Sequence, residues 1–502
     1  MTNFLKKYKL IFVFIIFLNI LLSAWYVINK DLMFHTDIAR DFLVLEDIVR
    51  THKPTLLGPR SGGIPGVFHG PLWFYVNLPI FILGKGNPVV VGWFWVFLSA
   101  LSIFATYYFG KKLFGEETGL LASLLLSVFS ISYTNNLFNP FGAVLLFPIF
   151  FYLLITYVKS AKFIYLIVAL FLLGLIIQFQ IAFGLPILVL LTIYLIPFFF
   201  KKKKLSHIFA YFILLIPLST YFLFELRHNF LQIRSVISYI TTKQSVGSLS
   251  MLNIFIQRAR GILFDGINII PQNYLLNFPV TILFAILIYK LKDKKFKYRN
   301  IYYLYFFFYF GFWILTLAFK GVVWGYYYWP FLPLTLIIFT SLFSKINKKI
   351  FALIFIYIFV INFISGIQAI KSAGTGWRFN YELAKKIYKD ADGSDFGYYI
   401  YTPDQFAYSE KYSILYVQNI FGQTVSHPYE KKALTYLIIA PPPEDKPYLK
   451  GDWWKSNQVK INRNPDKVFK YSNNMIVEKY LLSKEELKIP SDPNLIQDLI
   501  FR

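Results

Sequence analysis

The chain alternates between long apolar runs and short polar clusters. Its first apolar run, residues 10–29, holds 20 residues without a charged side chain, which is enough for an α-helix to cross a hydrocarbon core about 30 Å thick. A cleaved signal peptide would need a shorter apolar part and a small-x-small cleavage site, and Ser23-Ala24-Trp25 matches such a site poorly. The eleven predicted membrane spans are 10–29, 88–110, 118–138, 141–158, 163–183, 185–200, 207–225, 274–291, 301–319, 326–344 and 350–368.

Positive charge is concentrated in short loops beside these runs. Lysine and arginine outnumber aspartate and glutamate by 51 to 26, which gives a formal net charge of +25. Short basic loops mark the cytoplasmic side of a membrane protein, so the excess indicates topology, and nucleic acid is not an expected partner. Alternation over the predicted spans places the N-terminus in the cytoplasm and the residues after 370 outside the membrane. The clusters are Lys6, Lys7 and Lys9, 201–204, 290–299, and Lys345, Lys348 and Lys349.

Composition divides the chain into two predicted domains. The whole chain is 57% hydrophobic and 15% charged, whereas roughly a quarter of the residues in a soluble domain are charged. After residue 370 the proportions become those of a soluble protein, with alternating runs at 397–401 and 434–440 that predict strands and a helical pattern at 380–389. We therefore expect an α-helical polytopic membrane domain over 1–370 and a small extracytoplasmic α/β domain over 371–502. The absence of cysteine excludes disulfides.

The first long outer loop, residues 31–87, carries a carboxylate pair. Ile38, Phe42, Leu45 and Val49 recur at helical spacing and predict an amphipathic helix with one apolar stripe. Asp37 and Asp41 fall off that stripe, one turn apart. We expect the stripe to lie on the membrane surface, and we expect the apolar run 71–84, too short to span, to form a second interfacial helix. The plainer interpretation of the pair is an ordinary amphipathic helix with a local Asp–Arg contact.

Four segments in a fixed order carry a family resemblance. They are Asp37-Ile-Ala-Arg-Asp41, Gly70-Pro-Leu-Trp-Phe-Tyr75, Gly110-Lys-Lys-Leu-Phe-Gly-Glu116 and Tyr326-Tyr-Tyr-Trp-Pro-Phe-Leu-Pro333. In these segments the chain resembles the GT-C superfamily of membrane glycosyltransferases, and most of all the protein O-mannosyltransferases and the transferases that add aminoarabinose to lipid A. It departs from their pattern where Ile38 follows Asp37, and where His69-Gly70-Pro71 stands in place of Lys-Pro-Pro.

The resemblance implies an inverting transfer of a hexosyl or pentosyl group from a polyprenyl-phosphate donor to an acceptor hydroxyl at the outer face of the cell membrane. It implies Asp37 as the general base, with Asp41 as the second candidate. The resemblance leaves open whether the acceptor is a protein, a lipid or a glycan. It implies no certain cofactor, and whether a divalent metal binds near His35, Asp37 and Asp41 is also left open. Cations would bind the donor phosphate, and the candidates are Arg60, His69, Arg227, Arg258 and Arg260.

Plainer interpretations exist for some of these cations. Arg258 and Arg260 would also suit lipid headgroups, and Arg227 would suit an ion pair with Glu225. The alternative function is a transporter or flippase of a lipid-linked sugar, and a third is a non-catalytic assembly factor. Transporters carry charges near the bilayer midplane, whereas the predicted spans here are nearly free of charge. The pattern therefore favours the transferase.

Overall fold

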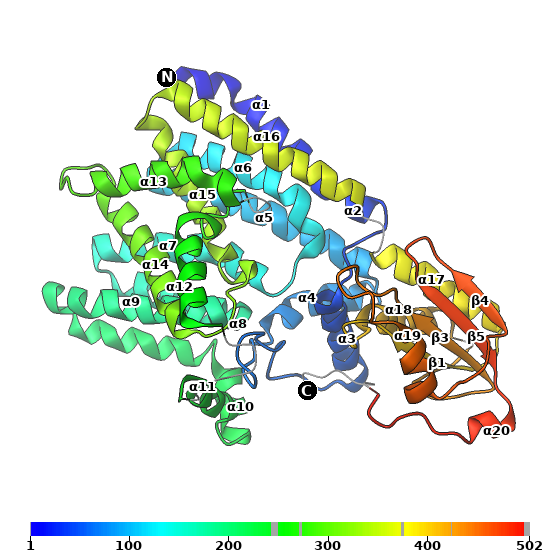
Figure 1. The fold of residues 1–502 in the computed structure, drawn as a ribbon. Coiled ribbons are helices and arrows are strands. Elements are labelled where there is room, and N and C mark those ends of the chain that lie inside the picture. Colours follow the sequence, from blue (N-terminus) through cyan, green and yellow to red (C-terminus); the bar gives the residue numbers. More distant parts are fainter. Residues whose placement is uncertain (1, 242–248, 271–273, 373–375, 423, 496–502) are drawn as a thin grey trace. The chain divides into compact units, whose positions relative to one another are not determined.

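A computed structural model describes residues 2–241, 249–270, 274–372, 376–422 and 424–495. The protein is mostly helical and includes one small sheet (Figure 1). The chain folds as two compact units. Unit 1 comprises Met1–Trp25, Pro54–Pro79 and Trp93–Lys371, and unit 2 comprises Tyr26–Lys53, Ile80–Gly92 and Ser372–Arg502. The predicted boundary after residue 370 nearly coincides with the end of unit 1, but unit 2 also takes in two segments from the N-terminal region.

Apolar helices dominate unit 1. Within the described ranges, six helices are long and apolar enough to cross a membrane, and a bent pair, η2 (Leu205–Leu215) with α10 (Ser219–Arg227), makes a seventh candidate. Every one of the eleven predicted spans coincides with an apolar helix, so the chain is a multi-pass membrane protein, and the exact number of spans stays a prediction. The helices are α1 (Thr2–Ser23), α5 (Pro88–Phe114), α6 (Glu116–Tyr133), α7 (Pro140–Ser160), α8 (Phe163–Phe179), α9 (Ile181–Lys202), α13 (Phe278–Lys290), α14 (Arg299–Leu315), α15 (Leu332–Thr340) and α16 (Lys348–Ser372).

Small and polar side chains fix how these helices pack. Asn19 on α1 donates its Nδ2 hydrogen to Ser127 Oγ on α6 at 2.9 Å, in a buried position. Near the turn between α5 and α6 the two helices approach closely at Gly110 and Gly119: a Cβ on Gly119 would lie 2.4 Å from the carbonyl oxygen of Tyr107, and a Cβ on Gly110 would lie 2.9 Å from the Cα of Gly119. This close approach explains the glycine that begins the Gly110–Glu116 segment, since the helices can pack this closely only where the side chain is absent.

The break between α8 and α9 organises one end of unit 1. Gln180 leaves helical geometry there, with φ −146° and ψ 89°. The carbonyl groups freed at the break accept hydrogen bonds from distant loops: Gly70 N lies 2.9 Å from Gln178 O, and Asn139 Nδ2 lies 2.7 Å from Phe179 O. Gln180 in turn donates to the carbonyl oxygen of Tyr326 at 3.3 Å. The break therefore ties three segments, far apart in sequence, to one place.

Unit 2 contains a five-stranded sheet in the order β2-β1-β3-β5-β4. The strands β2, β1 and β3 pair in parallel, β5 pairs with β3 antiparallel, and β4 pairs with β5 antiparallel, so that β4 runs in the same direction as the first three strands. Alternate side chains of β1 enter two cores: Phe396, Tyr398 and Ile400 pack with α17 and α18, and Tyr399 packs with the opposite layer. Both predicted strands and the predicted helix are present. The elements are β1 (Phe396–Tyr401), β2 (Ser426–Pro428), β3 (Leu434–Ile439), β4 (Lys467–Lys470), β5 (Ile476–Leu481), α17 (Trp377–Ala391) and α18 (Tyr408–Phe421).

The amphipathic helix α3 (Thr36–Thr51) belongs to unit 2. Its apolar stripe is buried, and the ring of Phe42 lies 5.3 Å from that of Tyr412 on α18. Phe34, just before α3, packs edge-on against Trp377 on α17 at 5.1 Å. The helix was predicted correctly, but the covering of its stripe was not: protein, rather than the membrane surface, contacts these side chains. The run 71–84 forms a 12-residue apolar helix, α4 (Leu72–Leu83).

Candidate active site

The N-terminal turn of α3 gathers two carboxylates around one arginine. His35 is the N-cap, and its Nδ1 accepts a hydrogen bond from Asp37 N at 3.2 Å. Arg40 reaches Asp37 Oδ1 with Nη1 at 2.6 Å, and it reaches Asp41 Oδ1 with Nε at 3.1 Å and Nη2 at 2.8 Å. The helical spacing of residues 37, 40 and 41 puts all three on one face, so the predicted pair is an ion-paired cluster rather than two independent acids.

The two carboxylates differ in environment. The side chain of Asp37 is 48% exposed, whereas that of Asp41 is 7% exposed. Burial raises the pKa of Asp41 to about 6, although the charge and hydrogen bonds of Arg40 act in the opposite direction. Its Oδ2 is buried without a hydrogen-bond partner in the described part of the chain. Asp37 can therefore meet a solvent-borne substrate, while Asp41 holds Arg40 from the protein side.

The loop that precedes α4 carries Arg60 and His69 in unit 1. Arg60 and Phe68 form an isolated antiparallel bridge, and His69 exchanges backbone hydrogen bonds with the stretch 58–59. Gly58 is required there, because a Cβ would lie 2.1 Å from the carbonyl oxygen of Gly70. The loop is thus a tight, paired structure. Arg60 is exposed on it and His69 is buried.

His69 contacts the start of α9. Its Nδ1 accepts a hydrogen bond from Ile181 N at 3.3 Å, and a neutral imidazole that accepts at Nδ1 carries its proton at Nε2. Ile181 is the first residue of α9, where backbone N–H groups lack intrahelical partners. The histidine therefore satisfies one of these donors at the start of α9.

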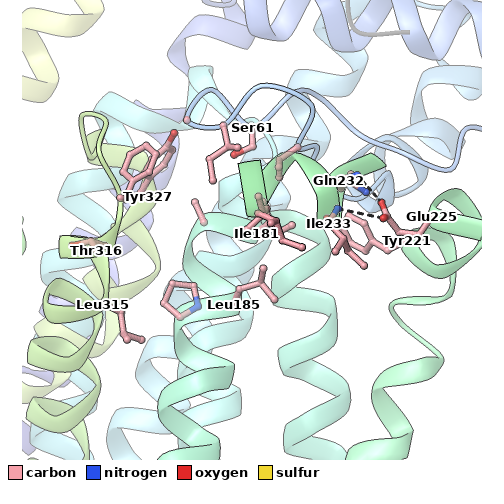
Figure 2. A pocket seen from close by; sticks show the side chains of 18 of the residues that line it. Ser61, Ile181, Leu185, Tyr221, Glu225, Gln232, Ile233, Leu315, Thr316 and Tyr327 are labelled. Carbon is pink, nitrogen blue, oxygen red and sulfur yellow. Dashed lines mark hydrogen bonds between the residues drawn. The ribbon is translucent and has the colours of Figure 1, made fainter. Parts of the chain in front are cut away.

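A cavity of about 710 Å³ lies in unit 1 beside this loop (Figure 2). Its walls come from the stretch 61–67, from α9, α10 and α11 (Leu231–Thr241), and from the segment after α14. Most of the lining is apolar, and an apolar cavity of this volume suits a lipid chain better than a polar solute. The polar residues that line it are Ser61, Tyr221, Glu225, Gln232, Thr316 and Tyr327.

Glu225 and Gln232 build one wall of that cavity. Glu225 accepts hydrogen bonds from Gln232 N at 3.2 Å and Ile233 N at 3.4 Å, so it caps the N-terminus of α11 (Figure 2). Gln232 accepts in turn from Phe68 N at 2.9 Å, which fastens the loop to α11. An ion pair of Glu225 with Arg227 was the plainer interpretation of the sequence, but the carboxylate serves the helix cap instead. Arg227 is exposed.

Arg258 and Arg260 lie at the end of α12 (Met251–Arg260) in different surroundings. Arg258 is 2% exposed and donates to three backbone carbonyl groups, those of Thr316 at 3.2 Å, Phe319 at 2.9 Å and Gly321 at 3.0 Å. Burial lowers the pKa of its guanidinium group. Its hydrogens thus hold the chain that leaves α14. Arg260 forms an ion pair with Asp265, with Nε and Oδ2 3.1 Å apart.

Two glutamines near this cavity were not among the predicted residues. The side-chain oxygens of Gln178 and Gln180 are buried without hydrogen-bond partners in the described ranges. The available signal was an amide pair inside an otherwise uncharged apolar run, and polar groups in such runs are usually functional. The same ranges contain no group of three His, Asp or Glu side chains arranged to hold a metal ion, and the ring of His35 is engaged by the start of α3.

Comparison with known proteins gives a likeness in fold alone. No protein-family model and no curated protein matches the chain. The solved structure of ArnT from Cupriavidus metallidurans bound to undecaprenyl phosphate matches with a TM-score of 0.58 and 11% identity, over 94% of this chain and 98% of that one. The apo form of ArnT matches with a TM-score of 0.59 and 9% identity over the same shares. An oligosaccharyltransferase from Archaeoglobus fulgidus matches with a TM-score of 0.49 and 11% identity, over 84% of this chain and 63% of its own.

The chain therefore has the fold of the ArnT structures, with many apolar helices and a small mixed sheet formed by its C-terminal residues. The predicted fold class is confirmed. Within that fold, the α3 carboxylates belong to unit 2, whereas Arg60, His69 and the large cavity belong to unit 1.

Proposed function

We propose that the protein is a membrane glycosyltransferase that takes a sugar from a polyprenyl-phosphate donor. The observation that carries this proposal is the large apolar cavity of unit 1, in a chain that has the fold of ArnT over nearly its whole length. A polyprenyl chain is apolar and extended, and it needs an apolar space that opens toward the bilayer. ArnT was crystallised with undecaprenyl phosphate, which supports a lipid of this class as the carrier.

The donor phosphate would lie where the apolar cavity meets polar groups. Ser61 lines the cavity and directly follows Arg60, and Ile181 lines it and is hydrogen-bonded to His69. A planar guanidinium group can bind two phosphate oxygens at once, and a helix N-terminus adds a favourable dipole. We assign Arg60 and His69 as the first phosphate ligands and Arg227, exposed at the end of α10, as the next candidate. Arg258 and Arg260 are the last candidates: Arg258 donates to the carbonyl oxygen of Thr316, and Arg260 forms an ion pair with Asp265.

In the proposed reaction, Asp37 accepts the proton of an acceptor hydroxyl. The hydroxyl oxygen forms a bond to the anomeric carbon of the donor sugar while the bond from that carbon to the phosphate oxygen breaks, and polyprenyl phosphate leaves. A single displacement of this kind inverts the anomeric carbon. Asp37 is suited to the role because it is half exposed, and its base form is oriented by Arg40. Asp41 positions Arg40 in turn.

The reaction would take place at the outer face of the cell membrane, with the N-terminus in the cytoplasm. The support is the alternation of basic loops with apolar helices along unit 1. The soluble composition of residues 371–502 supports a role for unit 2 in receiving the acceptor. A panel of hexose and pentose donors tests whether the transferred group is hexosyl or pentosyl.

The test is a turnover assay with purified full-length protein in lipid nanodiscs. The protein is incubated with a panel of polyprenyl-phosphate hexoses and pentoses, and mass spectrometry follows the release of polyprenyl phosphate. We expect release from one donor class, and loss of that release in the Asp37→Asn variant. Intact donors throughout the panel, in the presence of a membrane extract as the source of acceptor, would contradict the proposal. Movement of an intact donor between vesicles or between leaflets would instead favour the alternative function, a flippase of a lipid-linked sugar.

A further inference from the structure

Unit 2 contains a second, smaller cavity at one edge of its sheet. The cavity holds about 120 Å³, and its lining residues follow the carboxyl ends of all three parallel strands. Tyr401 ends β1 and Thr402 follows it, Tyr429 directly follows β2, and Trp454 comes after β3. The chain passes from β1 to β2 on one side and then to β3 on the other side of β1. In open α/β sheets, ligands bind at this edge, beside such a change of direction.

The lining combines aromatic faces with neutral hydrogen-bonding groups. Tyr401 and Trp454 stand with ring centroids 5.5 Å apart at 44°, and Tyr429 adds a third ring. No charged side chain is among the described residues that line the cavity. The hydrogen-bonding residues of the lining are Thr402, Gln405, Gln458 and Asn494.

Two of these amides are unused. The side chains of Gln405 and Gln458 make no hydrogen bond to any residue in the described part of the protein, and Gln405 is exposed. Each amide offers both a donor and an acceptor. Such a group matches an alcohol, which also donates and accepts, better than it matches an anion. The two amides enter the cavity from different strand connections, so a ligand could be held from two directions.

The backbone around the cavity is strained at two of these residues. Gln405 has φ 64° and Tyr429 has φ 55°, which is the left-handed region that residues other than glycine rarely occupy. Trp454 and Gln458 lie on a π-helical stretch, Trp454–Val459, and stretches of this kind often occur at functional sites. These conformations cost free energy, and their gathering at one cavity indicates a role beyond the folding of the domain.

We propose that this cavity binds one neutral sugar ring. The C–H face of the ring would pack on Tyr401 and Trp454, and its hydroxyl groups would bond to Gln405 and Gln458. The size of the cavity suits a single ring at the end or side of a glycan, and the neutral lining does not suit a phosphate, a nucleotide or an acidic sugar. The source of this sugar rests on the proposed transferase function. If that function holds, the ring belongs to the acceptor, and the acceptor is a glycan.

The binding test uses full-length protein in nanodiscs and an array of neutral, N-acetylated and anionic oligosaccharides. Nanodiscs replace maltoside detergents because those detergents carry sugars themselves. We expect binding to neutral glycans, confirmed in solution by saturation-transfer NMR. Gln405→Ala and Trp454→Ala should each weaken it at least tenfold. Trp453→Ala is the matched control, since Trp453 is adjacent, 65% exposed and outside the lining, and it should bind as the parent does.

The outcomes separate this inference from the proposed function. Donor turnover is measured on the same preparations with a membrane extract as the source of acceptor and without the glycans of the array. Binding without turnover would leave the sugar site standing and remove its role as an acceptor site. Turnover without binding to any glycan, binding to anionic glycans alone, or binding that survives both Gln405→Ala and Trp454→Ala would overturn the sugar site. Gln405→Ala keeps the test decisive if Trp454→Ala fails to fold, because an exposed glutamine contributes little to the core.

Discussion

Arg40 contacts Asp41 with two nitrogens on a single oxygen. Nε and Nη2 lie 3.1 and 2.8 Å from Oδ1, and Oδ2 stays buried without a partner in the described ranges. Nη1 of the same guanidinium group reaches Asp37 at 2.6 Å. Arg40 would therefore keep a charged partner if Asp37 lost its charge, which makes Asp37 a residue that can be changed with little effect on the fold.

This arrangement leads to a first prediction. Asp37→Asn should lower turnover by about 10²- to 10⁴-fold, the usual contribution of a general base, and leave donor affinity close to that of the parent. Steady-state turnover and donor binding are measured side by side. Asp47→Asn is the control, because Asp47 lies on the same helix and forms an ion pair with the exposed Arg50. If Asp37→Asn turns over normally, Asp41→Asn is tested next, and activity in both would remove α3 from the chemistry.

A second prediction concerns pH and Asp41. The pKa of this carboxyl is about 6 in the folded protein because burial disfavours its charge, and it is about 3.9 in an unfolded chain. The folded state thus binds more protons between these values, so Asp41 makes the protein less stable as the pH rises from about 4 to about 6. Asp41→Asn should remove that loss and raise the stability at pH 7, by roughly 3 kcal/mol at most.

Thermal unfolding of the parent and the variant across this pH range checks the prediction. The difference between the two melting curves isolates Asp41 from Glu410, whose pKa burial raises to about 7. A melting-temperature difference that is constant from pH 4 to pH 7 would contradict it.

Arg60 is the subject of a third prediction. Arg60→Ala should weaken the affinity for a polyprenyl phosphate by about 1.5–3 kcal/mol, the range for a lost hydrogen bond to a charged group, which is about 10- to 150-fold in Kd. Titration of the nanodisc-embedded protein with the lipid measures it. Arg234→Ala serves as the control, since Arg234 is an exposed arginine on α11 that donates to the carbonyl oxygen of His228. Equal losses in both variants would indicate a general effect of charge.

Arg258 gives a fourth prediction, of a different kind. Arg258→Ala leaves three buried or half-buried carbonyl groups without their donor, and each such group costs about 1–3 kcal/mol. The variant should therefore melt at a clearly lower temperature, while the folded fraction keeps its affinity for polyprenyl phosphate. A stable variant that no longer binds the lipid would instead make Arg258 a phosphate ligand.

The topology gives a fifth prediction. An alkaline phosphatase fused after residue 502 should be active in a bacterial host, and a fluorescent protein fused at the same place should be dark, because the basic loops place the C-terminal residues outside the membrane. The opposite pattern would reverse the membrane orientation and move α3 to the cytoplasmic side.

Much of the fold could be predicted because apolar length and periodicity are local properties. The stripe of Ile38, Phe42 and Leu45 determined that α3 is a helix and which side of it is buried. It could not determine what covers that side, because Tyr412 lies 370 residues further along the chain. The same limit explains why the role of Glu225 was predicted wrongly. Its neighbour Arg227 suggested an ion pair, but its carboxylate accepts hydrogen bonds from the N-terminus of α11, a helix that begins after a turn.

The site was predicted in part for the same reason. Charged residues in an apolar chain are conspicuous, so the α3 carboxylates and the loop cations were selected from the sequence. Gln178 and Gln180 carry no charge and were passed over, although they flank Phe179 at the break between α8 and α9, and the residues 178–180 together hold three distant segments. The break lies at Gln180, which is neither proline nor glycine. Such a break depends on tertiary contacts, so the local sequence does not predict it.

Unit 2 is assembled from three separate stretches of the chain, and this sets the order in which the protein can mature. The helix that carries Asp37 is synthesised among the first fifty residues, but α18, which covers its apolar stripe, emerges only after residue 407. During synthesis that stripe has no permanent partner, and contacts of such long sequence separation form late. The apolar stripe of α3 therefore gains its cover only once α18 has been made. A ribosome that stalls before α18 has emerged would release a membrane protein in which α3 is present but its apolar stripe lacks this cover.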